Sequence, residues 1–212
     1  MSHLKPAFIF DLDGTLVDTM PAHFVAWTEI AARHGLTFPE ARFYALGGVP
    51  TTKIAAMLIA EAGLTLDPKV IALEKEQLYY DGLAKEGGGV RAIEVVLEIA
   101  RQRRAEGPLA IASGSVRRLV VRTLETLGIA DWFAAVVTAE DTARHKPEPD
   151  VFLEAARRLG ADPAACVVYE DTDIGLEAAH RAGMAAVDVR PLIRDTTAAK
   201  PSQNVRAAPC DI

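Results

Sequence analysis

The sequence predicts an α/β fold in which helices cover both faces of a parallel sheet and a helical segment interrupts the chain after the first strand. Short apolar runs alternate with helical patterns between residues 92 and 189, which is typical of parallel strands buried on both faces. The region between residues 21 and 85 carries helical patterns and no strand. Polar groups suited to chemistry follow three of the apolar runs, at the strand ends where such sheets bind ligands.

The first apolar run, Ala7–Phe10, predicts a short buried strand that ends in Asp11. Side chains alternate along a strand, so Asp11 and Asp13 share a face if the extended conformation continues. Two carboxylates about 4 Å apart repel by about 4 kcal/mol at an effective dielectric near 20, so they need a cation or a shared proton. Gly14 then permits a tight turn. The stretch is a candidate metal and nucleophile site, although a simple Asp-Gly turn after a strand has the same pattern.

Three helices are predicted between residues 21 and 85. Apolar residues recur at helical spacing before Gly35 and again before Gly63, and both glycines are stop signals. A third helix is expected after Asp67, which serves as its N-cap, with Pro68 at the first helical position. Three consecutive glycines at positions 87–89 favour a linker or hinge after this segment.

The rest of the chain alternates between helices and strands. Helices are expected over residues 92–104, 116–127, 150–159 and 173–182, and strands over residues 108–112, 133–138, 166–169 and 185–189. Asp11, Ser113 and the pair Glu170 and Asp171 each end an apolar run, so parallel strands would bring them to one edge. The tail after Leu192 lacks periodicity and is expected to be loosely ordered.

Composition indicates an ordinary globular protein with a small-molecule partner. The 212 residues are 50% hydrophobic and 25% charged, with a formal net charge of -6, which argues against nucleic acid or an anionic membrane as a partner. No apolar stretch of about 18 residues occurs, so we expect a cytoplasmic protein, as a monomer or weak dimer. Cys166 lies in an apolar run, where a buried reduced thiol is expected.

Four segments resemble, in order, the motifs of the haloacid dehalogenase (HAD) superfamily. Asp11 to Thr15 resembles the DxDGT motif, and Ser113 resembles the strand-terminal Ser or Thr of the second motif. Lys146, with two prolines and Phe152 after it, resembles the KPxPxxF motif, and Glu170-Asp171 resembles the acidic fourth motif. The resemblance runs from Phe8 to about Val189. It implies a Rossmann-like core made by residues 1–18 and 87–212, with an inserted helical cap made by residues 19–86.

The resemblance also implies roles for these residues. Asp11 is the expected nucleophile and Asp13 the acid and base, while Ser113 and Lys146 bind and neutralise the phosphoryl group. Several carboxylates in one pocket favour a divalent ion, and oxygen ligands beside a phosphate favour Mg²⁺. The expected Mg²⁺ ligands are Asp11, the backbone carbonyl of Asp13, Glu170 and Asp171.

The branch that this sequence resembles contains β-phosphoglucomutase and sugar-phosphate phosphatases, including fructose-1-phosphate phosphatases. The expected substrate-binding residues are Gly14, Thr19, His23, Gly48, Thr51, Lys75 and Gly114. His23 and Lys75 are equally well explained as ordinary polar helix residues. The mutase has an Arg where this chain has Thr51, and the loss of a bidentate phosphate contact weakens a mutase interpretation.

The predicted function is a Mg²⁺-dependent phosphomonoester hydrolase that acts on a small phosphorylated sugar or related metabolite through an aspartyl phosphate. A hexose phosphate mutase, which returns the phosphoryl group to sugar, is the second hypothesis. The third is a non-catalytic phospho-acceptor switch similar to a response-regulator receiver, which the helical insert disfavours. Ser115 is expected to cap the helix that follows it, and Asp173 is a candidate cap for the helix after Asp171.

Overall fold

A five-stranded parallel sheet forms the centre of the structure, a computed structural model that describes residues 6–83 and 90–198. The strand order is β3-β2-β1-β4-β5 and every pairing is parallel. The strands are β1 (Ala7–Phe10), β2 (Leu109–Ala112), β3 (Ala135–Val137), β4 (Cys166–Glu170) and β5 (Ala185–Asp188). The predicted fold class and the predicted strands are confirmed.

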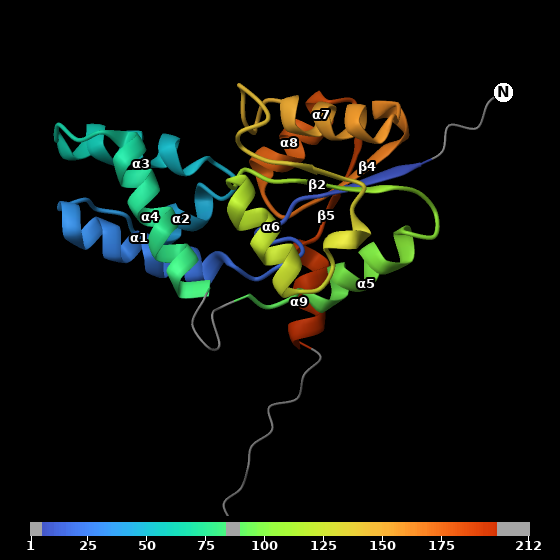
Figure 1. The fold of residues 1–212 in the computed structure, drawn as a ribbon, viewed down its shortest axis with the longest axis horizontal. Helices are drawn as coiled ribbons and strands as arrows, with labels where there is room; N and C mark the ends of the chain where they lie inside the picture. Colours follow the sequence, from blue (N-terminus) through green and yellow to red (C-terminus); the bar gives the residue numbers. More distant parts are fainter. Residues whose placement is uncertain (1–5, 84–89, 199–212) are drawn as a thin grey trace, which may run out of the picture.

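The side chains of each strand alternate between the two faces of the sheet, and both faces are apolar, so helices cover both. Ala7 and Ile9 point to the face covered by α7 (Asp150–Leu159) and α8 (Asp173–Arg181). Phe8 and Phe10 point to the opposite face, which is covered by α5 (Glu94–Arg103) and α6 (Arg117–Thr126). Figure 1 shows these two helical layers on either side of the strands. Two short 3-10 turns complete the connections, η1 (Ala130–Trp132) and η2 (Pro163–Ala165).

The central position of β1 decides where the polar strand ends meet. The chain builds β2 and β3 on one side of β1 and then returns to build β4 and β5 on its other side. In this register Phe10 is the partner of both Ile111 and Tyr169, so the residues that follow all three strands leave the sheet at one edge. The point where the strand order reverses is the usual ligand site of an open α/β sheet.

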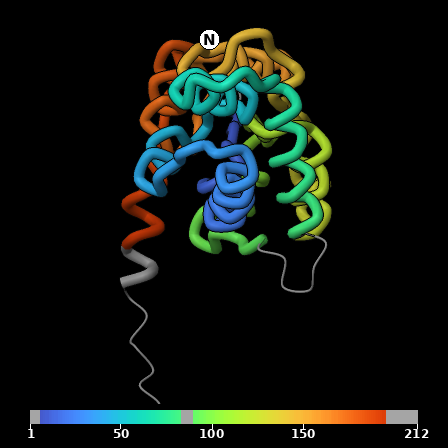
Figure 2. Tube along the Cα trace, turned by 90° about the vertical axis from the view of Figure 1, so that its left-hand side faces the viewer, coloured from blue at the N-terminus to red at the C-terminus, as the bar shows by residue number. Residues whose placement is uncertain are grey.

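Four helices between residues 20 and 83 pack around a separate hydrophobic cluster that includes Trp27, Ile30, Leu58 and Ile71. They are α1 (Met20–His34), α2 (Glu40–Ala45), α3 (Thr51–Ala62) and α4 (Pro68–Leu83). Figure 1 shows them beside the sheet, and Figure 2 views the molecule from their side. The division into a core and a cap at residues 18 and 86 stays a prediction.

The helix signals of this region are largely confirmed. Gly35 and Gly63 end α1 and α3 in the left-handed conformation. Asp67 accepts a hydrogen bond from the Lys69 amide at 2.8 Å, as expected of the residue that precedes α4. The short helix α2 was not predicted. The glycines at 87–89 lie outside the described residues.

One prediction about the C-terminus is wrong. The chain after Leu192 was expected to be loosely ordered, but α9 runs from Arg190 to Ala198. The helix packs against α5, and Ile193 contributes to the core on that face of the sheet, so tertiary contacts stabilise this helix. Residues after 198 lie outside the description. No helix in the described ranges is long and apolar enough to cross a membrane.

Candidate active site

Lys146 connects two of the strand-end acids. Its Nζ donates to Asp11 Oδ1 at 2.7 Å and to Glu170 Oε1 at 2.8 Å, and all three side chains are buried. The lysine reaches the site from the loop between β3 and α7, and its ammonium lies 5.0 Å from the centre of the Phe152 ring. Burial opposes the charge on Lys146, but Asp11 and Glu170 outweigh it and raise its pKa above the ordinary value.

A compact acidic cluster surrounds this ion pair. One oxygen from each of Asp11, Glu170 and Asp171 lies within 4.8 Å of the others. Burial raises the pKa of Asp11, and Glu170 and Asp171 raise it further against the opposing effect of Lys146. Burial and the Glu170 charge likewise raise the pKa of Asp171 to about 7. One lysine ammonium cannot neutralise three carboxylates, so the cluster favours a further cation. An oxygen-only donor set of this kind fits a hard divalent cation such as Mg²⁺.

Two glycines allow this cluster to form. Gly14 has a φ of 91°, and a Cβ at this position would lie 2.3 Å from Asp171 Oδ2. A Cβ on Gly175 would lie 1.9 Å from Glu170 Oε1. The Thr15 hydroxyl donates to Asp171 Oδ1 at 2.8 Å and orients that carboxylate. The amide of Gly14 donates to the Val17 carbonyl at 2.8 Å, so in this structure the turn itself uses that donor.

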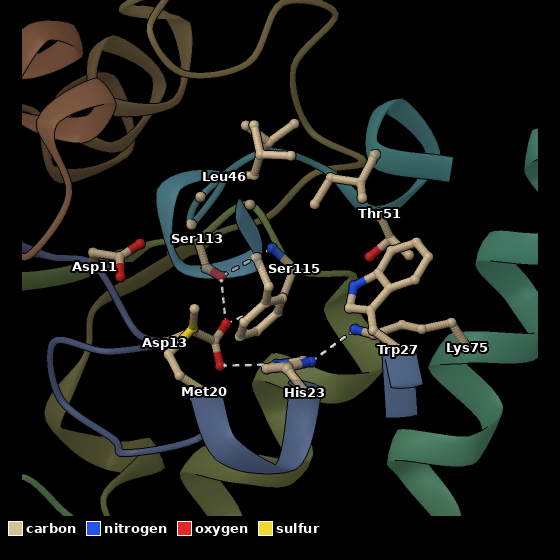
Figure 3. A pocket seen from close by; sticks show the side chains of 16 residues that line it. Asp11, Asp13, Met20, His23, Trp27, Leu46, Thr51, Lys75, Ser113 and Ser115 are labelled. Carbon is tan, nitrogen blue, oxygen red and sulfur yellow. Dashed lines mark hydrogen bonds and ion pairs between the residues drawn. The ribbon is translucent and has the colours of Figure 1, made fainter. Parts of the chain in front are cut away.

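Asp13 lies at the centre of a second hydrogen-bond network. Its carboxylate accepts from the hydroxyls of Thr19 at 2.6 Å and Ser115 at 2.7 Å, and Ser113 Oγ lies 3.5 Å away. His23 Nε2 lies 3.4 Å from the same carboxylate (Figure 3). Burial alone would raise the pKa of Asp13, but His23, Thr19 and Ser115 together hold it below its usual range.

The network continues into the helices through Lys75. Lys75 Nζ lies 2.7 Å from His23 Nδ1, so the ammonium donates to a neutral imidazole whose Nε2–H faces Asp13. Burial and the Lys75 charge lower the pKa of His23, and burial lowers the pKa of Lys75 to about 8. The Tyr79 ring stacks on His23 with a centroid distance of 3.8 Å. A continuous polar chain therefore links Asp13 to α4.

Most of the predicted residues line one small cavity of about 60 Å³ between the strand ends and the helices. Predicted residues around it are Asp11, Asp13, Ser113 and Gly114 from the sheet side and His23, Gly48, Thr51 and Lys75 from the helical side. Gly114 and Gly48 meet directly, since a Cβ on Gly114 would lie 2.8 Å from the Gly48 carbonyl oxygen. Thr19 supports Asp13 from outside the cavity lining, and Gly14 borders a neighbouring pocket with Asp171.

Sequence reasoning missed or misassigned several residues here. Ser115 is not a helix cap, because α6 begins after Val116 and the Ser115 hydroxyl is directed to Asp13. Asp173 is not the cap of α8, since Thr172 accepts from the Gly175 amide and Asp173 pairs with Arg190. Trp27 was read only as an apolar helix residue, yet it lines the cavity. The signal for Ser115 was available in its position two residues after Ser113.

Together, fold and site define a class of α/β enzyme in which charged side chains meet at the strand ends beneath a set of helices. The chain belongs to the haloacid dehalogenase-like hydrolases, since the model of that family matches residues 5–183. It is a phosphatase of this family.

Two curated relatives and one solved structure illustrate the similarity. Fructose-1-phosphate phosphatase YqaB from Escherichia coli (strain K12) is 40% identical over 184 residues, which cover 87% of this chain and 96% of that protein. β-Phosphoglucomutase from Bacillus subtilis (strain 168) is 33% identical over 187 residues, covering 86% of this chain and 82% of the relative. The crystal structure of a β-phosphoglucomutase from Clostridium difficile matches with a TM-score of 0.77 and 24% identity, covering 86% and 83% of the two chains, and supports the fold.

Proposed function

We propose that this phosphatase is a Mg²⁺-dependent phosphomonoester hydrolase that acts on a small phosphorylated sugar or related metabolite through an aspartyl-phosphate intermediate. The observation that carries the proposal is the buried Asp11–Lys146 pair at the end of the central strand, where Asp11 lines the same cavity as Asp13. A carboxylate held by one ammonium keeps a second oxygen for attack on phosphorus.

In the first step Asp11 attacks phosphorus in line and the sugar alcohol leaves. Lys146 and the Ser113 hydroxyl offset negative charge on the phosphoryl oxygens. Asp13 transfers a proton to the leaving oxygen and later accepts one from the water that hydrolyses the aspartyl phosphate. The pKa of Asp13 is held below its usual range in this structure, so the carboxylate is ionised and has a free site for a proton. Before it can donate a proton, Asp13 must take one up, and the hydrogen-bonded His23–Lys75 pair beside Asp13 can supply that proton.

The residues that would hold Mg²⁺ are Asp11, the backbone carbonyl of Asp13, Glu170 and Asp171. Three of these residues form the compact oxygen cluster, which supports the assignment. Glu170 is already bonded to Lys146 and to the Thr172 amide, so we assign Glu170 chiefly to orienting Lys146. We assign Asp171 to direct contact with the metal. When bound, the ion neutralises the acidic cluster and withdraws charge from the phosphoryl group.

The substrate class rests on the relatives and on the cavity. The 40% identical relative is a fructose-1-phosphate phosphatase, and another at 31% identity is a phosphorylated carbohydrates phosphatase from Thermotoga maritima. The polar lining from the helical side, His23, Thr51 and Lys75, suits the hydroxyls of a small sugar.

A hexose phosphate mutase is the alternative, because β-phosphoglucomutase is also a relative at 33% identity. Thr51 in place of a phosphate-gripping Arg favours hydrolysis. Isomerised sugar phosphate without net phosphate release would favour the mutase. The third hypothesis, a phospho-acceptor switch, conflicts with membership of a hydrolase family and is not proposed.

The experiment is a screen of sugar and nucleoside monophosphates for phosphate release with and without Mg²⁺. We expect release from sugar phosphates with Mg²⁺, and none from Asp11→Asn, which keeps the shape of the side chain. Asp81→Asn, on the exposed surface of α4, is the matched control and should keep full activity. Wild-type rates in Asp11→Asn would overturn the mechanism.

A further inference from the structure

Tyr79 of α4 is a buried aromatic residue to which the mechanism gives no role. Its ring stacks on the imidazole of His23, with a centroid distance of 3.8 Å and an angle of 11° between the two planes. The side chain is 3% exposed and belongs to a hydrophobic cluster with Ala26 of α1 and Leu119 of α6. Residues from α1, α4 and α6 therefore hold the Tyr79 ring in place.

The ring of Tyr79 also contacts the second member of the His23–Lys75 pair. The Lys75 ammonium lies 5.4 Å from the centre of the ring, because Lys75 and Tyr79 are one helical turn apart and share a face of α4. The Tyr79 hydroxyl lies near Thr19 and Thr123 without hydrogen-bond geometry to any described residue. The ring is thus the part of Tyr79 that makes the defined contacts.

The imidazole of His23 needs a restraint on its plane. Its two nitrogens contact Lys75 Nζ at 2.7 Å and Asp13 Oδ1 at 3.4 Å, as Figure 3 shows. The contact with Asp13 is at the long limit of a hydrogen bond, and the torsion about the Cβ–Cγ bond of a histidine has a broad range, so a small turn would break it. A parallel aromatic ring 3.8 Å away blocks that turn, because the edge of the imidazole would collide with it.

We propose that Tyr79 is a positioning residue that holds the His23 ring in the plane from which it exchanges a proton with Asp13. The inference rests on the proposed function, in which the His23–Lys75 pair supplies the proton that Asp13 gives to the leaving sugar oxygen. Tyr79 is not among the described residues that line the cavity, so it acts through His23. Loss of the ring should slow reactions that need proton donation and spare those that do not.

The alternative is that Tyr79 only fills the space between α1, α4 and α6. Such a role would lower the rates for all substrates in proportion, because every rate is measured on the same population of folded enzyme. It would also lower them whether or not His23 is present. Two readouts therefore separate the roles, namely the ratio of the rates for two leaving groups and the dependence of the effect on His23.

The test compares Tyr79→Leu and Tyr79→Met, which remove the ring, with Tyr79→Phe, which keeps it. Tyr80→Leu, at the next position of α4, is the matched control, and urea unfolding identifies the folded variants. For a ketohexose 1-phosphate we expect both ring-removing variants to lower kcat about tenfold, which is part of the usual acid–base contribution. For p-nitrophenyl phosphate, whose leaving group needs no proton, kcat should change by less than about twofold.

The other variants test whether the effect belongs to the ring and passes through His23. Tyr79→Phe and Tyr80→Leu should keep both rates within about twofold of wild type. In the His23→Phe enzyme, addition of Tyr79→Leu should lower kcat for the sugar phosphate by less than about twofold, because the group that Tyr79 positions is already absent.

Each contrary outcome decides between the two proposals. Unchanged rates, or equal losses for the two substrates, in the ring-removing variants would overturn the positioning role and leave the proposed function intact. A further tenfold loss in the His23→Phe enzyme would also overturn it, because Tyr79 would then act without His23. A shift of the same size in Tyr80→Leu would do the same. If wild type releases phosphate from neither ester, the proposed function itself fails, and this inference fails with it.

Discussion

Lys146 Nζ lies 2.7 Å from Asp11 Oδ1 although 135 positions separate the two residues in the chain. The pair is buried, and Glu170 shares the ammonium at 2.8 Å. A buried cation between two carboxylates is stable only while all three groups are present, because each remaining charge would otherwise be desolvated without a partner. The ion pair thus joins the stability of the core to the reactivity of Asp11.

Lys146→Met should destabilise the protein and abolish most activity. Loss of one member of a buried ion pair costs about 3–5 kcal/mol, and we expect this loss at pH 8, where Asp11 and Glu170 are left without compensation. At pH 5 the loss should be smaller, because the raised pKa of Asp11 allows it to take up a proton. Urea unfolding at both pH values measures the effect, with the exposed Lys53→Met as control. An equal loss of stability at pH 5 and pH 8 would contradict the raised pKa assigned to Asp11.

Asp171→Asn should stabilise the metal-free protein at pH 8. The pKa of Asp171 is raised from 3.8 to about 7, so the folded state holds this proton more tightly than the unfolded state. Ionisation of Asp171 therefore lowers the free energy of unfolding of the wild type as the pH rises above 3.8. The loss is complete above about 7, where it reaches up to about 4 kcal/mol. Unfolding in EDTA at pH 4 and pH 8 tests this, and the gain should appear only at pH 8.

Added Mg²⁺ should make the wild type more stable than Asp171→Asn, which reverses their order of stability in EDTA at pH 8. The ion binds the folded wild type and raises its unfolding temperature, whereas Asp171→Asn has lost a ligand and should respond weakly. Asp173→Asn is the control, because its side chain is 86% exposed two positions away. Equal stabilisation of wild type and Asp171→Asn by Mg²⁺ would show that Asp171 is not a ligand.

His23→Phe should lower kcat by about 100-fold for a sugar phosphate, within the usual range for a lost acid–base contribution. Phenylalanine keeps the stacking on Tyr79 but removes the contacts to Asp13 and Lys75. The loss should be much smaller for p-nitrophenyl phosphate, whose leaving group needs no proton. His34→Gln, at the end of α1 in a partly buried pair with Glu74 of α4, should change neither rate. Equal losses for both substrates would assign His23 to substrate binding alone.

Gly175→Ala should inactivate the enzyme although it replaces no charged residue. The added methyl would meet Glu170 Oε1 at 1.9 Å, so the carboxylate must leave its contact with Lys146. We expect a loss of about 1–3 kcal/mol in stability together with a large fall in kcat. Gly82→Ala in α4 has free space around its Cβ and should stabilise the protein by up to about 1 kcal/mol. Full activity in Gly175→Ala would show that the position of Glu170 is not critical.

The strands and their polar ends were predictable because the signal is local. Each buried strand is a short apolar run, and each polar residue that follows it marks the carboxyl end. The order of the motifs made the convergence of Asp11, Ser113, Lys146 and Asp171 an expectation, and the structure brings them to one edge. Helix α9 was not predicted, and the contacts that stabilise it join α9 to α5, far away in the chain.

The sequence by itself determined the α/β class, the parallel strands and the acids at their ends, since these depend on apolar runs a few residues long. Only the tertiary structure decided which groups touch Asp13, and that Ser115 is one of them. The reason is physical. Hydrogen bonds and ion pairs require separations near 3 Å, and the packing of whole helices against the strand ends sets those separations.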